Sequence, residues 1–441
     1  MSDLNAQALT YHASPVPGKL SLKCTKPCAT QHDLSLAYTP GVAKPCLEIQ
    51  AHPEDIYKYT GRGNCVAVVS DGTAVLGLGN IGPGAGMPVM EGKCVLFKRF
   101  ADIDAVPLCL SKCAGADGRT DAKKLISVIE TLEPSFGGIN LEDIAAPACF
   151  EVETTLKERM GIPVFHDDQH GTAIISLAAL YNAAKLTGRK LEEMKVVANG
   201  AGAAGLSCIE FYITAGVRRE NVVVCDSKGV ITKATASNPA KAAVATSRTD
   251  LHTLADAVRG ADLFLGCSVA NCLTADMVRS MAKDPIIFAM ANPTPEIDPA
   301  QAWEAGAAVV GTGRTDFPNQ INNVLGFPGI FRGALDCRAH TITEGMQLAA
   351  SKALAELAEL PVEGALRDEL AAAYPEDAAN GIFDGANPLK RHYVIPKPFD
   401  PRVVPHVARF VVAAAQSEGV AQLSVADLDA YEASVAARIR P

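Results

Sequence analysis

The chain has 441 residues, 48% of them apolar and 20% charged, as in globular proteins that bury a core in about two or three domains. Acidic side chains outnumber basic ones by 49 to 40, and the formal charge of −9 without a basic run argues against a nucleic-acid-binding surface. No run of about 18 apolar residues could span a membrane, and no signal peptide is recognisable. We therefore expect a cytoplasmic protein.

The 13 cysteines are scattered along the chain. Cys24/Cys28 and Cys109/Cys113 have C-x-x-x-C spacing, and no two C-x-x-C motifs supply four zinc ligands. Such thiols are typical of small buried side chains in a reducing compartment.

Residues 1–30 are rich in Pro, Ser, Lys and Thr, and we expect them to form an extended arm. The segment 31–163 alternates short β-like runs with helix-like ones, which indicates a first α/β domain. The β-like runs are 65–69, 95–97 and 106–110, and the helix-like runs are 121–132 and 147–160. Small apolar residues at helical spacing predict a further helix over 173–187.

Strand-like and helix-like patterns alternate regularly from residue 194 to about 335. The strand candidates are 195–199, 221–225, 262–266, 285–290 and 307–311. They predict a Rossmann-type, doubly wound parallel sheet that binds ligands outside the carboxyl ends of its strands. Helix-like runs follow over 343–360 and 403–417. The expected domains are 1–163, 164–400 and a helical extension over 401–441.

A glycine motif in the second domain indicates a dinucleotide. Gly200, Gly202 and Gly205 form G-x-G-x-x-G between a predicted strand and a predicted helix, with Ala203 and Ala204 inside the motif. Backbone N–H groups at such a turn can approach a pyrophosphate. Asp226, at the end of the next predicted strand, could bind a ribose diol. The alternative is a glycine-rich turn that binds nothing.

A second G-x-G-x-x-G motif occupies residues 77–82. The Pro- and Gly-rich run 83–88 follows it, and we do not expect this run to begin an ordinary helix. We therefore interpret residues 77–82 as an active-site loop that faces the cleft.

Two pairs of carboxylates lie in apolar surroundings. Glu142 and Asp143 are adjacent at a predicted strand end, and Asp167 and Asp168 precede the predicted helix over 173–187. Together they could form an all-oxygen site for Mg²⁺ or Mn²⁺. The alternative is that an aspartate caps the helix and that Glu142 and Asp143 are solvated.

Lys93 and Tyr38 are further candidates. Lys93 begins the β-like run after the glycine-rich loop, and Tyr38 lies at a predicted turn. A lysine held near a metal and partly desolvated would have a lowered pKa and could act as a base. The alternatives are a solvated surface lysine and an amphipathic surface tyrosine.

Long motifs, in order along the chain, resemble those of malic enzymes. They are 36–43 (LAYTPGVA), 90–93 (MEGK), 141–144 (LEDI), 165–173 (FHDDQHGTA), 291–293 (ANP), 313–324 (GRTDFPNQINNV) and 395–400 (IPKPFD). The resemblance runs from about residue 30 to about residue 415. It is closest to the short bacterial type, without the phosphotransacetylase-like domain that some relatives carry.

The resemblance implies a role for each matching residue. Lys93 would be the general base, Tyr38 the general acid, and Asp167 a proton-relay group. The metal ligands would be Glu142, Asp143 and Asp168. Asn292 would contact the substrate or the nicotinamide, as would Asn323. Larger relatives bind a malate carboxylate with an arginine in the glycine-loop segment, but residues 71–75 read DGTAV here, so that partner is left open.

The resemblance also implies the reaction, in which (S)-malate and NAD(P)⁺ give pyruvate, CO₂ and NAD(P)H. Asp226 suits NAD, whereas the neighbouring Lys228 could pair with a 2′-phosphate and favours NADP. The alternatives are a malolactic-type enzyme that gives lactate, a nucleotide-sensing protein with a decayed site, and an amino-acid dehydrogenase. We expect a homodimer or larger homo-oligomer, with no nucleic-acid or membrane partner.

Overall fold

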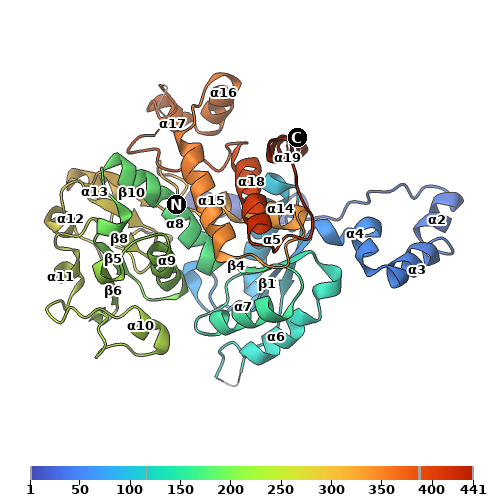
Figure 1. Cartoon of the computed structure of the whole chain (residues 1–441), viewed down its shortest axis with the longest axis horizontal. Helices are drawn as coiled ribbons and strands as arrows, with labels where there is room; N and C mark the ends of the chain where they lie inside the picture. The colour runs from blue at the N-terminus through green and yellow to red at the C-terminus, as the bar shows by residue number, and fades with distance from the viewer. Residues whose placement is uncertain (1, 116, 386–388, 440–441) are drawn as a thin grey trace.

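The computed structural model describes residues 2–115, 117–385 and 389–439. They form two β-sheets, whose strands are mostly parallel, and a helical layer between and above the sheets (Figure 1). The first sheet has the order β2-β1-β3-β4, and all its strands are parallel. Its strands are β1 (Cys65–Ser70), β2 (Asp104–Cys109), β3 (Gly138–Leu141) and β4 (Val164–His166). Because β4 pairs with β3, this sheet extends past the expected domain boundary at residue 163.

The helices α6 (Ala122–Glu130) and α7 (Ala148–Arg159) confirm two predictions. The β-like run over 95–97 is wrong, because it lies inside α5 (Pro83–Ala101). The expectation that no helix begins at residue 83 is also wrong. Proline is favoured in a first helical turn, where its missing N–H has no partner to lose.

The second sheet has the order β10-β9-β8-β5-β6-β7. Its strands are β5 (Val196–Asn199), β6 (Val222–Asp226), β7 (Gly229–Val230), β8 (Leu263–Gly266), β9 (Ile286–Ala289) and β10 (Val309–Thr312). Only the short β7 is antiparallel among these strands of the described chain. The five predicted strands and the doubly wound topology are confirmed, and the strand order reverses between β5 and β8, where such folds bind dinucleotides.

A layer of helices joins the two sheets (Figure 1). The long helix α8 (Asp167–Leu186) follows β4 and is buried on most of its faces, and its apolar residues share one core with both sheets. Helix α15 (Glu344–Glu359) packs directly on α8, α18 (Val403–Ser417) packs on α15, and α14 (Phe327–Asp336) and α19 (Leu428–Ile439) pack on α18. The predicted helices over 343–360 and 403–417 are thereby confirmed. None of the helices in the described ranges is long and apolar enough to cross a bilayer.

The remaining α-helices border the second sheet or cover the upper edge of the molecule. They are α9 (Ala203–Thr214), α10 (Pro239–Ala243), α11 (Leu254–Val258), α12 (Ala275–Ser280), α13 (Pro299–Glu304), α16 (Gly364–Ala373) and α17 (Pro375–Ala379).

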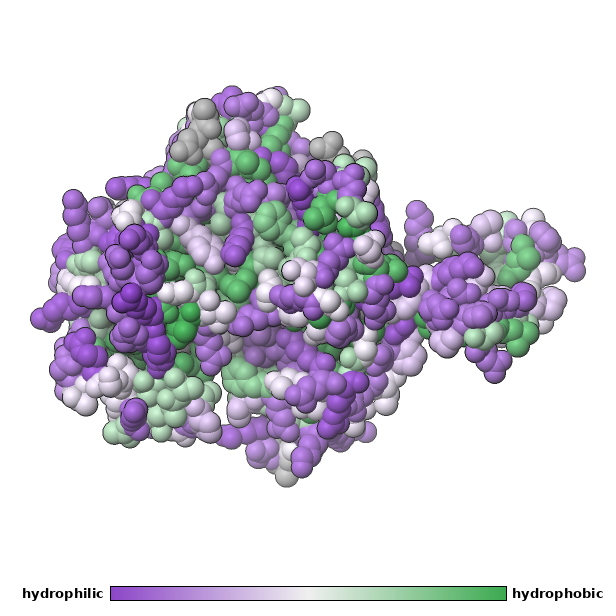
Figure 2. Space-filling view, viewed as in Figure 1, coloured by the Kyte–Doolittle hydropathy of each residue, from purple (hydrophilic) through white to green (hydrophobic). Residues whose placement is uncertain are grey.

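The amino-terminal segment differs from the expected extended arm. Residues 2–13 form helix α1 (Ser2–Ala13), because this stretch contains three alanines and two leucines, and the Pro-rich part begins only at residue 15. Residues 20–59, which we call the amino-terminal lobe, then leave the body and return to β1. The lobe contains α2 (Gln31–Ala37), α3 (Ala43–Ala51) and α4 (Ile56–Tyr59), and it projects from one side of the molecule (Figures 1 and 2).

Candidate active site

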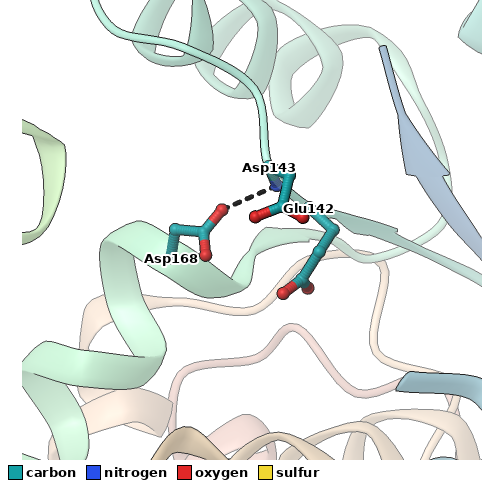
Figure 3. Close-up of side chains that lie close together, drawn as sticks. All are labelled: Glu142, Asp143 and Asp168. Carbon is teal, nitrogen blue, oxygen red and sulfur yellow. Dashed lines mark hydrogen bonds between the residues drawn. The ribbon is translucent and has the colours of Figure 1, made fainter. Parts of the chain in front are cut away.

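Three carboxylates converge at the carboxyl edge of the first sheet. Glu142 and Asp143 directly follow β3, and Asp168 lies in the first turn of α8, directly after β4. One oxygen from each of the three lies within 4.8 Å of the others, and the side chains point toward one another (Figure 3). The Asp143 backbone N–H donates to Asp168 Oδ2 at 2.7 Å. This all-oxygen set suits Mg²⁺ or Mn²⁺.

The alternative interpretation of these acids does not hold. Glu142 and Asp143 are buried rather than solvated. No side chain caps α8, because Asp168 accepts from Asp143 and Asp167 contacts Lys93 instead. Burial raises the pKa of Glu142 well above its ordinary value and the neighbouring carboxylates add to this rise, although Lys93 opposes it. A divalent cation would relieve that repulsion.

Lys93 projects from α5 into the same cluster. Its Nζ lies 2.5 Å from Asp167 Oδ2 and 3.0 Å from Glu142 Oε1, and it sits over the Phe327 ring at 4.4 Å. The lowered pKa of Lys93 was predicted for a cluster that holds a metal ion, and it stays a prediction. Burial alone would lower the pKa of Lys93, but Asp167 and Glu142 outweigh burial and raise it. Asp167 is fully buried, and its Oδ1 has no hydrogen-bond partner among the described residues.

Neighbouring side chains fix the loops that carry the cluster. Asp71, after β1, accepts from the hydroxyls of Thr73 and Thr120 at 2.7 and 2.6 Å. Thr73 Oγ1 in turn accepts from the Ala145 backbone N–H at 3.0 Å, which ties this turn to the loop after β3. The segment 71–75 therefore braces the site, although it contributes no arginine.

The glycine motif of residues 200–205 forms the tight turn that a dinucleotide site requires. A Cβ on Gly200 would lie 2.2 Å from the Cys267 carbonyl oxygen, and one on Gly205 would lie 2.0 Å from that of Gly200. Gly202, by contrast, has open space around its Cβ position, and α9 begins directly after it without a side-chain cap. Its free backbone N–H groups suit a pyrophosphate.

The acidic residue at the end of β6 is paired with a lysine. Lys241, on α10, lies 2.5 Å from Asp226 Oδ2, and the Lys228 backbone N–H donates to Asp226 Oδ1 at 2.8 Å. Burial alone would raise the pKa of Asp226, but Lys241 and the Lys228 N–H lower it overall.

The two sites adjoin each other. Ala203, in the dinucleotide turn, packs against the apolar core of the first sheet. A Cβ on Gly77 would lie 2.8 Å from the Asn292 carbonyl oxygen, so the glycine-rich loop abuts the loop after β9. Asn323 approaches α8 closely, because a Cβ on Gly171 would lie 2.8 Å from the Cβ of Asn323. The Lys93 cluster and the glycine turn therefore lie in adjoining segments, where the two sheets meet.

Comparison with known sequences identifies the two halves of the chain. Residues 17–157 match the malic enzyme N-terminal domain, and residues 169–369 match the malic enzyme NAD-binding domain.

The chain belongs to the malic enzyme family.

Individual malic enzymes show how far the likeness reaches. The chain is 52% identical to an NADP-dependent malic enzyme of Salmonella typhimurium over 97% of its length. It is 53% identical to a bifunctional malic/malolactic enzyme of Bacillus subtilis, over 96% of this chain and 95% of that one. The crystal structure of an NAD-dependent malic enzyme from Thermotoga maritima shares 44% identity at a TM-score of 0.80, over 92% of this chain and 98% of that one. The chain spans about half of the Salmonella protein, 54% of its length.

The fold brings most of the malic enzyme motif residues together, but not Tyr38. Tyr38 ends α2 on the protruding lobe, and its side chain is 69% exposed. Helix α2 lies far from α5 in Figure 1, so Tyr38 is remote from Lys93 of the same chain.

Two further residues brace the candidate site and were not predicted. Glu296 is fully buried and accepts from the backbone N–H groups of Ser268 at 2.8 Å and Ala291 at 3.0 Å, which joins the loops after β8 and β9. Glu153, on α7, accepts from the His166 backbone N–H at 3.0 Å and contacts the His170 ring at 2.8 Å, and so braces the start of α8. Glu153 lies in a helix and Glu296 in a loop, and neither belongs to a sequence motif that predicts its role.

Proposed function

We propose that this chain catalyses the oxidative decarboxylation of (S)-malate to pyruvate and CO₂, with reduction of NAD(P)⁺. The observation that carries the proposal is the contact of Lys93 with the carboxylate cluster, beside a dinucleotide turn. Oxidation of a secondary alcohol needs a base for the proton and a dinucleotide for the hydride.

Each residue of the cluster has a proposed task. Lys93 accepts the proton of the C2 hydroxyl, and the buried Asp167 holds the ammonium group in place and can relay the proton outward. Glu142, Asp143 and Asp168 would hold Mg²⁺ or Mn²⁺, which when bound supplies a Lewis acid that polarises the C2 oxygen and eases loss of CO₂. Such an ion would also offset the carboxylate charge that raises the pKa of Lys93. Asn292 lies beside the glycine-rich loop and Asn323 beside the start of α8, where substrate and nicotinamide would meet.

We propose NADP as the preferred dinucleotide, bound through Gly200, Gly202 and Gly205. The ion pair between Lys241 and Asp226 supports this preference, because it offsets the carboxylate that would repel a 2′-phosphate. Lys228 is a second candidate partner for the 2′-phosphate, because its backbone N–H contacts Asp226 and so keeps this lysine next to the end of β6. We also propose a cytoplasmic location, supported by 13 cysteines that all stay free thiols.

The deciding experiment measures nicotinamide reduction with malate and Mn²⁺, in parallel with NADP and NAD, and quantifies pyruvate. One pyruvate formed for each NADPH supports the proposal, and a higher kcat/KM with NADP supports the proposed preference. No reduction with either dinucleotide would exclude oxidative decarboxylation.

A malolactic reaction is the second candidate, favoured by the Bacillus relative's name and its 53% identity. It uses the same base and the same carboxylates but ends in lactate without net reduction. Lactate that accumulates without NADPH would identify it.

A further inference from the structure

We propose that a cavity at the amino-terminal edge of the second sheet binds a small phosphate monoester, and that this ligand strengthens NADP binding at the opposite edge. The binding itself needs no catalysis, whereas the effect on NADP rests on the proposed function. The Lys93 cluster and the dinucleotide turn both lie at carboxyl ends of strands, so the cavity is a separate site.

The cavity lies where α11 and the residues before it cross the amino ends of β5, β6 and β8 (Figure 1). The lining residues Lys195, Asn221 and Ala261 each lie one or two positions before one of these strands. Its volume is about 420 Å³, within the range of about 300–1,000 Å³ that small-molecule sites occupy. Strand β5 has four residues, so roughly 13 Å separate the cavity from the dinucleotide turn.

Apolar side chains form the floor of the cavity. Val197, Val223 and Ala257 line it and belong to one apolar core on the second sheet, against which the lining residue Leu251 packs. The first three are less than 10% exposed, so the cavity reaches into the edge of the core. Sites for small molecules commonly combine such an apolar floor with a few polar groups.

Six charged side chains of the described chain border the cavity, and three of them already have partners. Arg248 and Asp250 form an ion pair through two hydrogen bonds of 2.7 and 2.6 Å. Asp256 accepts from the backbone N–H and the hydroxyl of Thr253 at 2.9 and 2.8 Å, and so belongs to the cap of α11. The remaining three are Lys195, Glu220 and Arg259.

The charges that remain match a phosphate monoester. Within the described ranges, the side chains of Lys195 and Arg259 form no ion pair and no hydrogen bond. A guanidinium can bind a phosphate through two parallel N–H groups, and an ammonium binds it as a point charge. A phosphate monoester carries about −1.5 to −2 charges at pH 7, which the two cations would neutralise. Glu220, which has no partner in the same ranges, would accept from a hydroxyl group of the ligand.

Residues 248–253, which we call the rim segment, connect the cavity to the hairpin beside the dinucleotide site. The His252 carbonyl oxygen accepts from the Val230 backbone N–H at 2.9 Å, and a Cβ on Gly229 would lie 2.2 Å from that oxygen. Gly229 and Val230 form β7, which pairs with the end of β6 at Asp226. A ligand that fixes the rim segment would therefore hold β7 against the carboxylate that faces NADP.

Isothermal titration calorimetry with ribose 5-phosphate tests the site. We expect saturable binding to the wild-type chain and none of ribose, which lacks the phosphate. Lys195→Ala and Arg259→Ala should each raise the Kd about tenfold or more, because each removes hydrogen bonds to a charged group. Lys352→Ala, at an exposed lysine of α15 outside the cavity, should leave the Kd unchanged.

Three outcomes would overturn the site. The first is a wild-type chain that does not bind ribose 5-phosphate at millimolar concentration. The second is a chain with both Lys195→Ala and Arg259→Ala that binds as tightly as the wild type. The third is binding that is lost in Lys241→Ala but not in that double variant, which would place the phosphate beside Asp226 in the dinucleotide site.

NADP titration with the same probe tests the coupling. Saturating ribose 5-phosphate should lower the Kd for NADP about fivefold, and NADP should lower the Kd for ribose 5-phosphate by the same factor, because coupling between two ligands is reciprocal. The double variant should lose this shift and keep the Kd that the wild type has for NADP alone. A wild-type Kd for NADP that ribose 5-phosphate does not change would overturn the coupling.

A separate assay distinguishes this inference from the proposed function. Nicotinamide reduction and pyruvate are measured with malate and Mn²⁺ but without ribose 5-phosphate. A chain that binds both ligands with the expected coupling but forms no pyruvate would contradict the proposed function and leave the cavity assigned. A chain that forms pyruvate but fails the calorimetric test would contradict the cavity alone.

Discussion

At the scale of single residues, the candidate site concentrates charge where water is largely excluded. Lys93, Glu142 and Asp167 are each less than 10% exposed, and Lys93 contacts both carboxylates. Buried charges are tolerated only when they are paired or bind an ion, and here the carboxylates outnumber the single lysine. Such an excess of buried negative charge is costly in a structural core, and it is typical of a catalytic site.

Replacement of Lys93 by alanine should abolish the base without removing the dinucleotide site. We expect kcat to fall about 10²–10⁴-fold, the contribution typical of general acid–base catalysis, with little change in NADP affinity. Steady-state kinetics and NADP titration measure the two quantities. Lys98→Ala is the matched control, because Lys98 lies on the same helix with its side chain 53% exposed. Near-normal turnover of Lys93→Ala would rule Lys93 out as the base.

A second substitution tests the dinucleotide preference. Lys241→Ala should raise the KM for NADP about tenfold, or ~1.4 kcal/mol, because Asp226 would then face the 2′-phosphate unpaired. The KM for NAD should stay the same or fall, since NAD lacks that phosphate. Lys233→Ala, an exposed lysine nearby in sequence, should change neither constant. Equal effects on both dinucleotides would exclude Lys241 as the discriminating residue.

At the scale of elements, the sequence predicted the second sheet better than the first. Each strand of the second sheet ends in a turn of small or polar residues, and its five predicted strands are confirmed. Helix α5 was missed because its start is rich in Gly and Pro, and its run over 95–97 is too short to separate strand from helix by period. Its buried face is Met90, Cys94, Phe97 and Ala101, which is a helical spacing.

The candidate site shows the same division. Contiguous motifs predicted the carboxylates, Lys93 and the glycine turn, because each motif places its residues on one turn or one strand end. Lys241 and Glu296 act through contacts that are distant in sequence, so no local pattern marks them. The separation of Tyr38 from Lys93 depends on the direction in which the lobe leaves the body, and composition does not encode it.

Packing between α14 and α18 gives a test at the same scale. A Cβ on Gly333 would lie 2.7 Å from the Ala408 carbonyl oxygen and 2.9 Å from the Val411 Cβ. Gly333→Ala should therefore lower the free energy of unfolding by about 1–3 kcal/mol through overpacking. Urea denaturation measures the change. Gly92→Ala is the control, because its Cβ would meet only the Lys19 Nζ at 3.5 Å, and alanine in a helix is favoured over glycine by about 0.5–1 kcal/mol. A stabilised Gly333→Ala chain would show that the two helices can move apart.

At the scale of the whole molecule, the site lies where the halves of the chain meet. The carboxyl edge of the first sheet supplies the carboxylates, the second sheet supplies the dinucleotide turn, and α8 carries Asp168 at its start before it runs through the common core. An ion held by Asp168, Glu142 and Asp143 would therefore join the first sheet to the helix that connects both halves. Binding at this point should stabilise the entire fold rather than one loop.

The expected consequence is a metal-dependent unfolding temperature. A ligand that binds only the folded state stabilises it by about 2.7 kcal/mol at a hundredfold excess over its Kd. We therefore expect Mn²⁺ or Mg²⁺ to raise the Tm of the wild-type chain after EDTA treatment, as measured by scanning calorimetry. Asp168→Asn should abolish that rise, because it removes one of the three carboxylates while it keeps an oxygen for the Asp143 N–H. Asp276→Asn, at a carboxylate that is 92% exposed, should leave the rise intact. If Asp168→Asn showed the same rise as the wild type, the ion would bind elsewhere, and the cluster would need another account of its buried charge.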